Sequence, residues 1–228
     1  MNNQKVNIGN VFILGDSYST FRGYIPEGYD CYYSEDGPHY LNAMPGVDIG
    51  PNDVCKVEHT WWYNLARENG TLVRNCSYSG TTICHTGYNK SDNSIISFVA
   101  RLDKLLEEGF FKENKIDTFF LFGGTNDSWA EAPLGEEILA DWKKEDLYNV
   151  FPAFGYLIHT LVNNLADTKI YCILNTGLKD EISQFFARIC RENGVDVIEL
   201  HDIDKVEGHP TIEGMKQIKD QISEHISR

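Results

Sequence analysis

The stretch that decides the fold is residues 9–20, which read GNVFILGDSYST. Residues 10–14 form a short, nearly all-apolar run, typical of a strand buried on both faces and too short for a helix. Gly15-Asp16-Ser17 follows at once, a turn-prone triplet that puts a hydroxyl at the carboxyl end of the strand, where ligands of parallel sheets bind. The stretch predicts a strand that delivers Ser17 to a candidate site; the alternative is an ordinary serine-capped turn.

Working outward, apolar runs and cap signals alternate along the chain. We expect further strands at 71–75, 117–122, 169–175 and 195–200, and helices at 60–70, 95–106, 152–165, 181–193 and 212–226. The helix at 95–106 is amphipathic, with Ile95 on the same side as Phe98. This alternation implies parallel strands with right-handed crossovers. The sequence predicts a single α/β domain over 1–228, a three-layer α/β/α sandwich with a five-stranded parallel sheet in the flavodoxin-like order 2-1-3-4-5.

A long irregular segment, residues 21–58, interrupts this pattern after the first strand. It holds five glycines, four prolines and five tyrosines, and neither helical nor strand periodicity persists across it. A loop of this length inside a domain is usually functional or disordered, and its aromatic content argues against disorder. We therefore expect an ordered loop insertion beside Ser17.

Composition narrows the function classes. The formal charge is −14, which argues against nucleic acid or an anionic membrane as partner. No apolar run approaches the ~18 residues of a membrane span, and the polar N-terminus shows no signal peptide. We expect a cytoplasmic protein with mostly reduced, buried cysteines, or an exported one whose leader has been removed. In the exported case Cys31 and Cys55 are the candidates for a disulfide.

Three later segments place chemically useful residues beyond strand or loop ends, as Ser17 is placed. They are NCSYSG at 75–80, GGTND at 123–127 and GHP at 208–210. The carboxyl ends of parallel strands share one edge of the sheet, so Ser17, Gly80, Asn126 and His209 are expected on one rim. A serine there acts as a nucleophile only if a base activates it and donors hold the resulting oxyanion.

Taken in order, GDS at 15–17, NCSYSG, GTND at 124–127 and GHP resemble the four signature blocks of the SGNH, or GDSL-type, hydrolases over nearly the whole chain. The resemblance implies that Ser17 is the nucleophile and His209 the general base. It also implies an oxyanion hole made by the backbone N–H groups of Ser17 and Gly80 and the side-chain amide of Asn126. Separately, each residue has a plain structural explanation: a helix-entry glycine, a helix cap and a surface histidine.

One position departs from the family pattern. Relatives usually carry aspartate three residues before the histidine, where this chain has Val206. Glu207 or Asp204, and less directly Asp202, are the candidate acids that would orient His209. A backbone carbonyl is the alternative and would leave a Ser17–His209 dyad; our preference is for a side-chain carboxylate. An ordinary histidine base predicts activity that titrates between about pH 5 and 8.

The sequence indicates no cofactor. Its histidines lack HxxxH or HExxH spacing, so no metal site is expected, and Walker A and GxGxxG sequences are absent. The function we expect is a serine ester hydrolase acting on a small or carbohydrate O-acyl ester, with the aromatic insertion and Trp61 and Trp62 stacking on sugar rings. The alternatives are a lipase or lysophospholipase, and a non-catalytic carbohydrate-binding module on the same fold. The oligomeric state is not predicted.

Overall fold

Five parallel strands form the centre of the computed structural model, which describes residues 6–36 and 52–228. The strands are β1 (Gly9–Gly15), β2 (Gly70–Ser77), β3 (Thr118–Phe122), β4 (Lys169–Leu174) and β5 (Asp196–Glu199), with a small hairpin of β6 (Lys205–Val206) and β7 (His209–Pro210). The helices are α1 (Trp61–Asn69), α2 (Phe98–Glu107), α3 (Phe110–Glu113), α4 (Thr125–Trp129), α5 (Val150–Asn164), α6 (Asp180–Glu192) and α7 (Ile212–Ile226).

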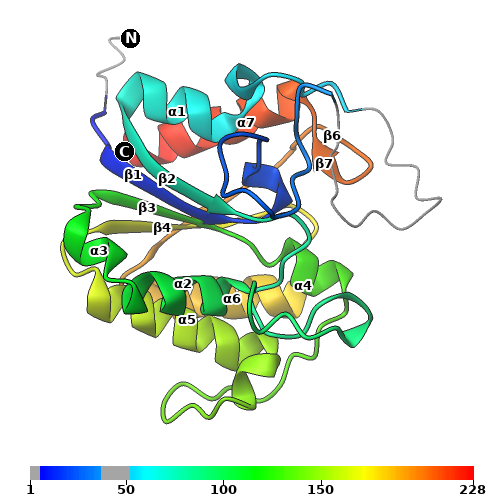
Figure 1. Cartoon of the computed structure of the whole chain (residues 1–228), viewed down its shortest axis with the longest axis vertical. Helices are drawn as coiled ribbons and strands as arrows, with labels where there is room; N and C mark the ends of the chain where they lie inside the picture. The colour runs from blue at the N-terminus through cyan, green and yellow to red at the C-terminus, as the bar shows by residue number, and fades with distance from the viewer. Residues whose placement is uncertain (1–5, 37–51) are drawn as a thin grey trace.

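The sheet order is β2-β1-β3-β4-β5 with every neighbouring pair parallel, which confirms the predicted flavodoxin-like order. Helices α1 and α7 cover one face, and α2, α3, α5 and α6 lie on the other, so the predicted three-layer architecture is also confirmed (Figure 1). Because β1 lies between β2 and β3, the turn after it opens between two neighbouring strands at the carboxyl edge of the sheet.

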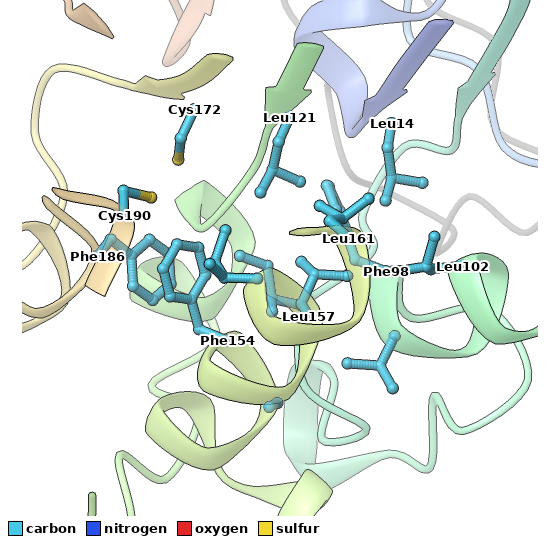
Figure 2. Close-up of a cluster of buried hydrophobic side chains, with 14 of the residues drawn as sticks. Leu14, Phe98, Leu102, Leu121, Phe154, Leu157, Leu161, Cys172, Phe186 and Cys190 are labelled. Atoms are coloured by element: carbon cyan, nitrogen blue, oxygen red, sulfur yellow. The ribbon is translucent and has the colours of Figure 1, made fainter. Parts of the chain in front are cut away.

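Strand β1 is buried on both faces, as its apolar run predicts. Phe12 and Leu14 point into the cluster beneath α2 and α5, whereas Val11 and Ile13 point into the cluster beneath α1 and α7. Figure 2 shows the first of these clusters, in which strand side chains such as Leu14 and Leu121 face the helices. Successive residues of a strand alternate between faces, so one short run contributes to two separate cores.

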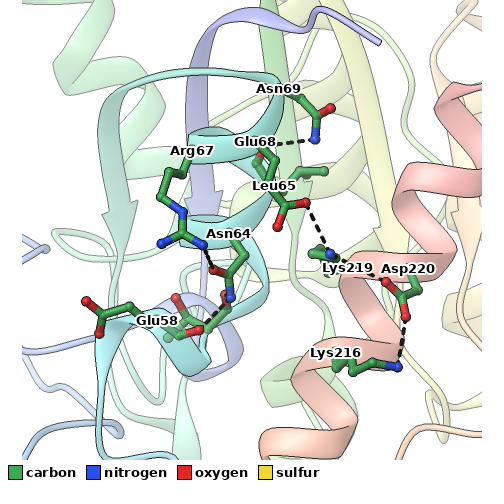
Figure 3. Close-up of polar contacts among 10 residues, drawn as sticks. Glu58, Asn64, Leu65, Arg67, Glu68, Asn69, Lys216, Lys219 and Asp220 are labelled. Atoms are coloured by element: carbon green, nitrogen blue, oxygen red, sulfur yellow. Dashed lines mark hydrogen bonds and ion pairs between the residues drawn. The ribbon is translucent and has the colours of Figure 1, made fainter. Parts of the chain in front are cut away.

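The other face is held mainly by buried side chains of α1 and α7. Trp61 and Trp62 are both fully buried there, so they are core residues and do not form the sugar-stacking surface that we expected. Between the same helices, Glu68 and Lys219 form an ion pair at 3.2 Å (Figure 3). Exposed ion pairs of this kind add little stability. The buried tryptophans therefore contribute more than this ion pair to the stability of the contact between the helices and the sheet.

Several local expectations change. Helix α2 begins at Phe98 after Ser97, whose side chain accepts the Ala100 N–H; Ile95 lies outside the helix and is 82% exposed. The N-cap hydrogen bond, rather than the apolar period, decides where the helix begins. The loop expected at 201–208 contains strand β6 of the hairpin. Of the expected insertion at 21–58, residues 37–51 lie outside the described part.

Two findings bear on the compositional expectations. Cys31 and Cys55 are both free thiols in the structure, so the disulfide considered for an exported protein is not formed. Within residues 6–36 and 52–228, no helix is long and apolar enough to cross a membrane.

Candidate active site

Ser17 lies in a tight turn immediately after β1. The turn is a short 3-10 helix, Ser17–Ser19, which begins where the Asp16 side chain accepts the Tyr18 N–H at 3.1 Å. Gly15 permits this turn, because a Cβ there would meet the Ser77 Oγ of the neighbouring strand at 2.6 Å. The sheet edge is therefore closely packed where it delivers the serine hydroxyl.

His209 reaches Ser17 from the other end of the chain, on strand β7. Its Nε2 lies 3.0 Å from the Ser17 Oγ, and both side chains are buried. This is hydrogen-bond distance, at which an imidazole can accept the hydroxyl proton. A parallel sheet that presents such a serine–histidine pair at the carboxyl end of its strands is the framework of a serine hydrolase.

The second imidazole nitrogen contacts a carbonyl rather than a carboxylate. His209 Nδ1 lies 3.2 Å from the backbone oxygen of Glu207. Glu207 and Gly208 join β6 to β7 as a two-residue turn, and both have positive φ, 49° and 75°, as type I′ hairpins require. This turn is tight enough to bring the Glu207 carbonyl back to the ring that follows it.

The structure thus corrects the expected orienting carboxylate. The carboxylate of Asp204 accepts a hydrogen bond from the Thr211 hydroxyl, at the N-cap of α7, and Asp202 pairs with His201 on the surface. The only contact of Glu207 with the imidazole, within the described residues, is through its main chain. The alternative left open by the sequence, a backbone carbonyl behind a Ser17–His209 pair, is the geometry found.

The charge state of His209 follows from its burial. Burial lowers the pKa of His209 to about 4, the Glu207 carbonyl opposes this shift, and the nearby Lys205 ammonium adds to it. The imidazole is therefore neutral, and able to accept a proton, well below the range in which an ordinary histidine titrates. Activity that depends on this base is therefore expected to titrate below the pH 5 to 8 range of an ordinary histidine.

The candidate oxyanion donors lie around the same turn. The backbone N–H groups of Ser17 and Gly80 have no acceptor among the described residues, which leaves them available to a ligand. Asn126 Nδ2 donates to the Thr81 carbonyl at 3.0 Å and makes a longer contact of 3.4 Å with Asp16. The structure therefore brings the Asn126 amide to the residue that precedes the serine.

Arg101 is a member of the site that the sequence did not reveal. Although it lies on α2, it is buried, and its guanidinium donates to the carbonyls of Gly15, at 2.9 Å, and Cys76, and to the Thr81 hydroxyl at 3.0 Å. It therefore joins the ends of β1 and β2 to the loop after Gly80. An arginine on an amphipathic helix gives no sequence signal for this role, because only the fold shows which carbonyls it meets.

Two exposed aromatic residues border the site. The ring of Trp129 lies 5.7 Å from the His209 ring and is 43% exposed, and the Tyr88 hydroxyl donates to Asn126 Oδ1 at 2.8 Å with the residue 38% exposed. The spacing of Asn126 and Trp129, three residues apart on α4, is a signal that could have placed both on one helix face. These rings, rather than Trp61 and Trp62, are available to a ligand.

Comparison with known proteins identifies the family of the chain. A family model described as GDSL-like lipase/acylhydrolase matches residues 9–226. A Bacteroides uniformis structure, provisionally described as a GDSL-like lipase, is 44% identical over 96% of this chain and 95% of its own, with a TM-score of 0.83. A similarly described Bacteroides ovatus structure is 41% identical over 96% and 98%, with a TM-score of 0.84. A search among curated proteins found no match.

The chain therefore belongs to the GDSL-like lipase/acylhydrolase family, the SGNH hydrolases. A more distant structure, a carbohydrate acetylesterase from Sinorhizobium meliloti, shares 13% identity over 96% of this chain and 98% of its own, with a TM-score of 0.57. That likeness is one of fold.

The Glu207 carbonyl contact generates a test. Glu207→Gln and Asp204→Asn should each lower kcat by less than about tenfold, since neither carboxylate touches the imidazole. Loss of the orienting acid of a serine triad costs ~10⁴. We would measure kcat for both single variants and the double variant; a loss of a thousandfold in any of them would restore the carboxylate.

The burial of His209 generates a second test. Because burial lowers the pKa of His209 to about 4, the neutral base persists as the pH falls, and kcat/KM should reach half its plateau near pH 4 rather than near 6.5. Circular dichroism at each pH would separate titration from unfolding. A midpoint between 6 and 7 in folded protein would contradict the buried, neutral imidazole.

Proposed function

We propose that this protein is a serine esterase that forms an acyl-enzyme on Ser17 and deacylates a small or carbohydrate O-acyl ester. The observation that carries the proposal is the 3.0 Å contact between the Ser17 hydroxyl and the neutral, buried His209 imidazole. A serine hydroxyl is a weak nucleophile, and an imidazole in this position and charge state is the group that activates it.

The reaction follows from this contact. His209 Nε2 takes the Ser17 proton as Oγ attacks the acyl carbon, and the imidazolium then gives that proton to the leaving alcohol. Water attacks the acyl-enzyme in the same way, and the acid is released. The free N–H groups of Ser17 and Gly80 would hold the oxyanion. The third donor would be the Asn126 side-chain amide, whose contact with the Asp16 carboxylate is long, at 3.4 Å.

The preference for a carbohydrate or other small alcohol rests on Trp129. His209 returns its proton to the leaving oxygen, so the alcohol departs on the histidine side of the site, where the exposed Trp129 ring lies. An exposed indole offers a flat apolar surface for a sugar ring. Carbohydrate esterases among the distant structures share this fold, which is consistent with the proposal.

Replacing the nucleophile tests the chemistry. Ser17→Ala should abolish ester hydrolysis and labelling by a fluorophosphonate while leaving the melting temperature nearly unchanged. Ser19→Ala is the matched control, because Ser19 lies in the same turn and its buried hydroxyl has no partner among the described residues. Turnover of p-nitrophenyl acetate that survives in Ser17→Ala would reject Ser17 as the nucleophile.

A substrate panel tests the specificity. With p-nitrophenyl esters from acetate to decanoate, kcat/KM should be highest for the shortest chains, whereas a lipase would prefer the longest. Trp129→Ala should raise KM for an acetylated oligosaccharide by about two- to tenfold, the strength of an aromatic contact, and leave KM for ethyl acetate unchanged. Binding of the oligosaccharide without any turnover would favour the non-catalytic module.

A further inference from the structure

The face of the His209 ring is covered by Tyr32. The two ring centroids lie 3.5 Å apart with the planes 7° from parallel, and Tyr32 is almost fully buried. We infer that Tyr32 is a positioning residue that replaces the missing carboxylate: its ring holds the plane of the imidazole, and its π-face stabilises the imidazolium formed when Ser17 loses its proton. This inference rests on the proposed function for its catalytic consequence.

The backbone of Tyr32 is joined to the turn that holds the nucleophile. Its N–H donates to the Thr20 Oγ1 at 3.1 Å, and that hydroxyl donates to the Ser17 carbonyl at 3.0 Å. Thr20 is fully buried, so this link is shielded from water. A single residue therefore contacts both the serine turn, through its main chain, and the histidine ring, through its side chain.

Neighbouring tyrosines hold the main chain on both sides of His209. The Tyr18 hydroxyl donates to the carbonyl of Gly208, and the Tyr33 hydroxyl donates to that of Pro210 at 2.9 Å. With the main chain held and Nδ1 on the Glu207 carbonyl, what remains to be set is the plane of the ring, and the parallel face of Tyr32 sets it.

The electrostatic need for such a face is specific to this site. A carbonyl accepts the Nδ1 proton but carries no net negative charge, so the imidazolium lacks the counter-charge that a triad aspartate supplies. An aromatic face attracts a cation through its quadrupole, an effect equivalent to about three- to thirtyfold in an equilibrium constant.

The groups that surround the imidazole come from several elements, and they differ in their effect on its charge. They are the Ser17 hydroxyl, the phenol rings of Tyr18, Tyr32 and Tyr33, the Glu207 carbonyl, the Trp129 ring in a T-shaped contact, and the Lys205 ammonium. Lys205 disfavours the imidazolium, and its Nζ donates to Asn175 and Thr176, with the shortest contact 2.6 Å. The Tyr32 face and the Glu207 carbonyl are thus the groups that favour the charged ring.

The experiment compares three replacements of Tyr32. Phenylalanine keeps the ring, leucine removes it, and pentafluorophenylalanine keeps the shape but reverses the quadrupole of the face. Two quantities are measured: kcat with p-nitrophenyl acetate, and the pKa of His209 from the ¹⁵N shifts of its imidazole in the unliganded protein. The second needs no turnover, so it tests the inference separately from the proposed function.

We expect Tyr32→Phe to match the wild type within about twofold in kcat. Tyr32→Leu and the pentafluorophenylalanine variant should lower kcat by about three- to thirtyfold and lower the pKa of His209. The pKa counts as lowered only if the variant ring is neutral at a pH at which the variant is folded and the wild-type ring is protonated. Tyr171→Leu is the matched control: Tyr171 is buried and stacked on Phe120 in the same apolar layer, so its loss should reduce the melting temperature alone.

Two results would overturn the inference. One is an unchanged pKa of His209 in the pentafluorophenylalanine variant, which would leave Tyr32 a packing residue. The other is a raised pKa in Tyr32→Leu with unchanged kcat, which would mean that Tyr32 acts only by excluding water. If the wild type hydrolyses no ester but the pKa falls as expected, the proposed function fails and the interaction between Tyr32 and His209 stands.

Discussion

The hydrogen bond between Ser17 and His209 is the interaction on which the rest of the site depends. Its two partners are separated by 192 positions along the chain, one in the turn after the first strand of the sheet and the other on the last hairpin. They meet only when β1 is enclosed by its neighbours and α7 has packed against α1. The contact therefore joins the first strand of the sheet to the C-terminal part of the fold.

Buried polar side chains lie next to the contact between Ser17 and His209. Burial raises the pKa of Asp16 to about 7 and that of Asp127 to about 6, against opposing hydrogen bonds from backbone N–H groups. The Asp127 carboxylate accepts hydrogen bonds from the N–H groups of Ile83 and Cys84. The Arg101 guanidinium donates to the Gly15 carbonyl at the end of β1. Buried polar groups of this kind destabilise the fold unless they are paired. Here the hydrogen bonds that pair them also order the loops that line the site.

Among the described residues, the His209 imidazole has a backbone carbonyl rather than a carboxylate at its Nδ1. Burial keeps His209 uncharged and ready to accept a proton, but the same burial penalises the imidazolium that must follow. The Glu207 carbonyl at Nδ1 and the Tyr32 ring on the face both lower that penalty without introducing a charge. In the two-residue hairpin turn it is the main chain of Glu207 that makes this contact.

The sequence by itself determined the architecture and the positions of the main site residues. Alternation of apolar runs with capped amphipathic segments predicts the parallel sheet and its layers, because local periodicity records which side of each element is buried. The strand order is expected by analogy with flavodoxin-like sheets. Ser17, Gly80, Asn126 and His209 could be placed on one rim because each lies just past a strand or loop end that the sequence marks.

Only the tertiary structure decided which neighbours those residues meet. His209 is contacted by the main chain of Glu207 rather than by its carboxylate. This contact depends on the two positive φ angles of the hairpin turn, which the spacing of residues in the sequence does not encode. Contacts between distant segments decide three further features. Tyr32 covers the imidazole, Arg101 donates to the carbonyls at the strand ends, and Trp61 and Trp62 lie in the core. Periodicity reports burial within one element, whereas these contacts follow from how separate elements pack.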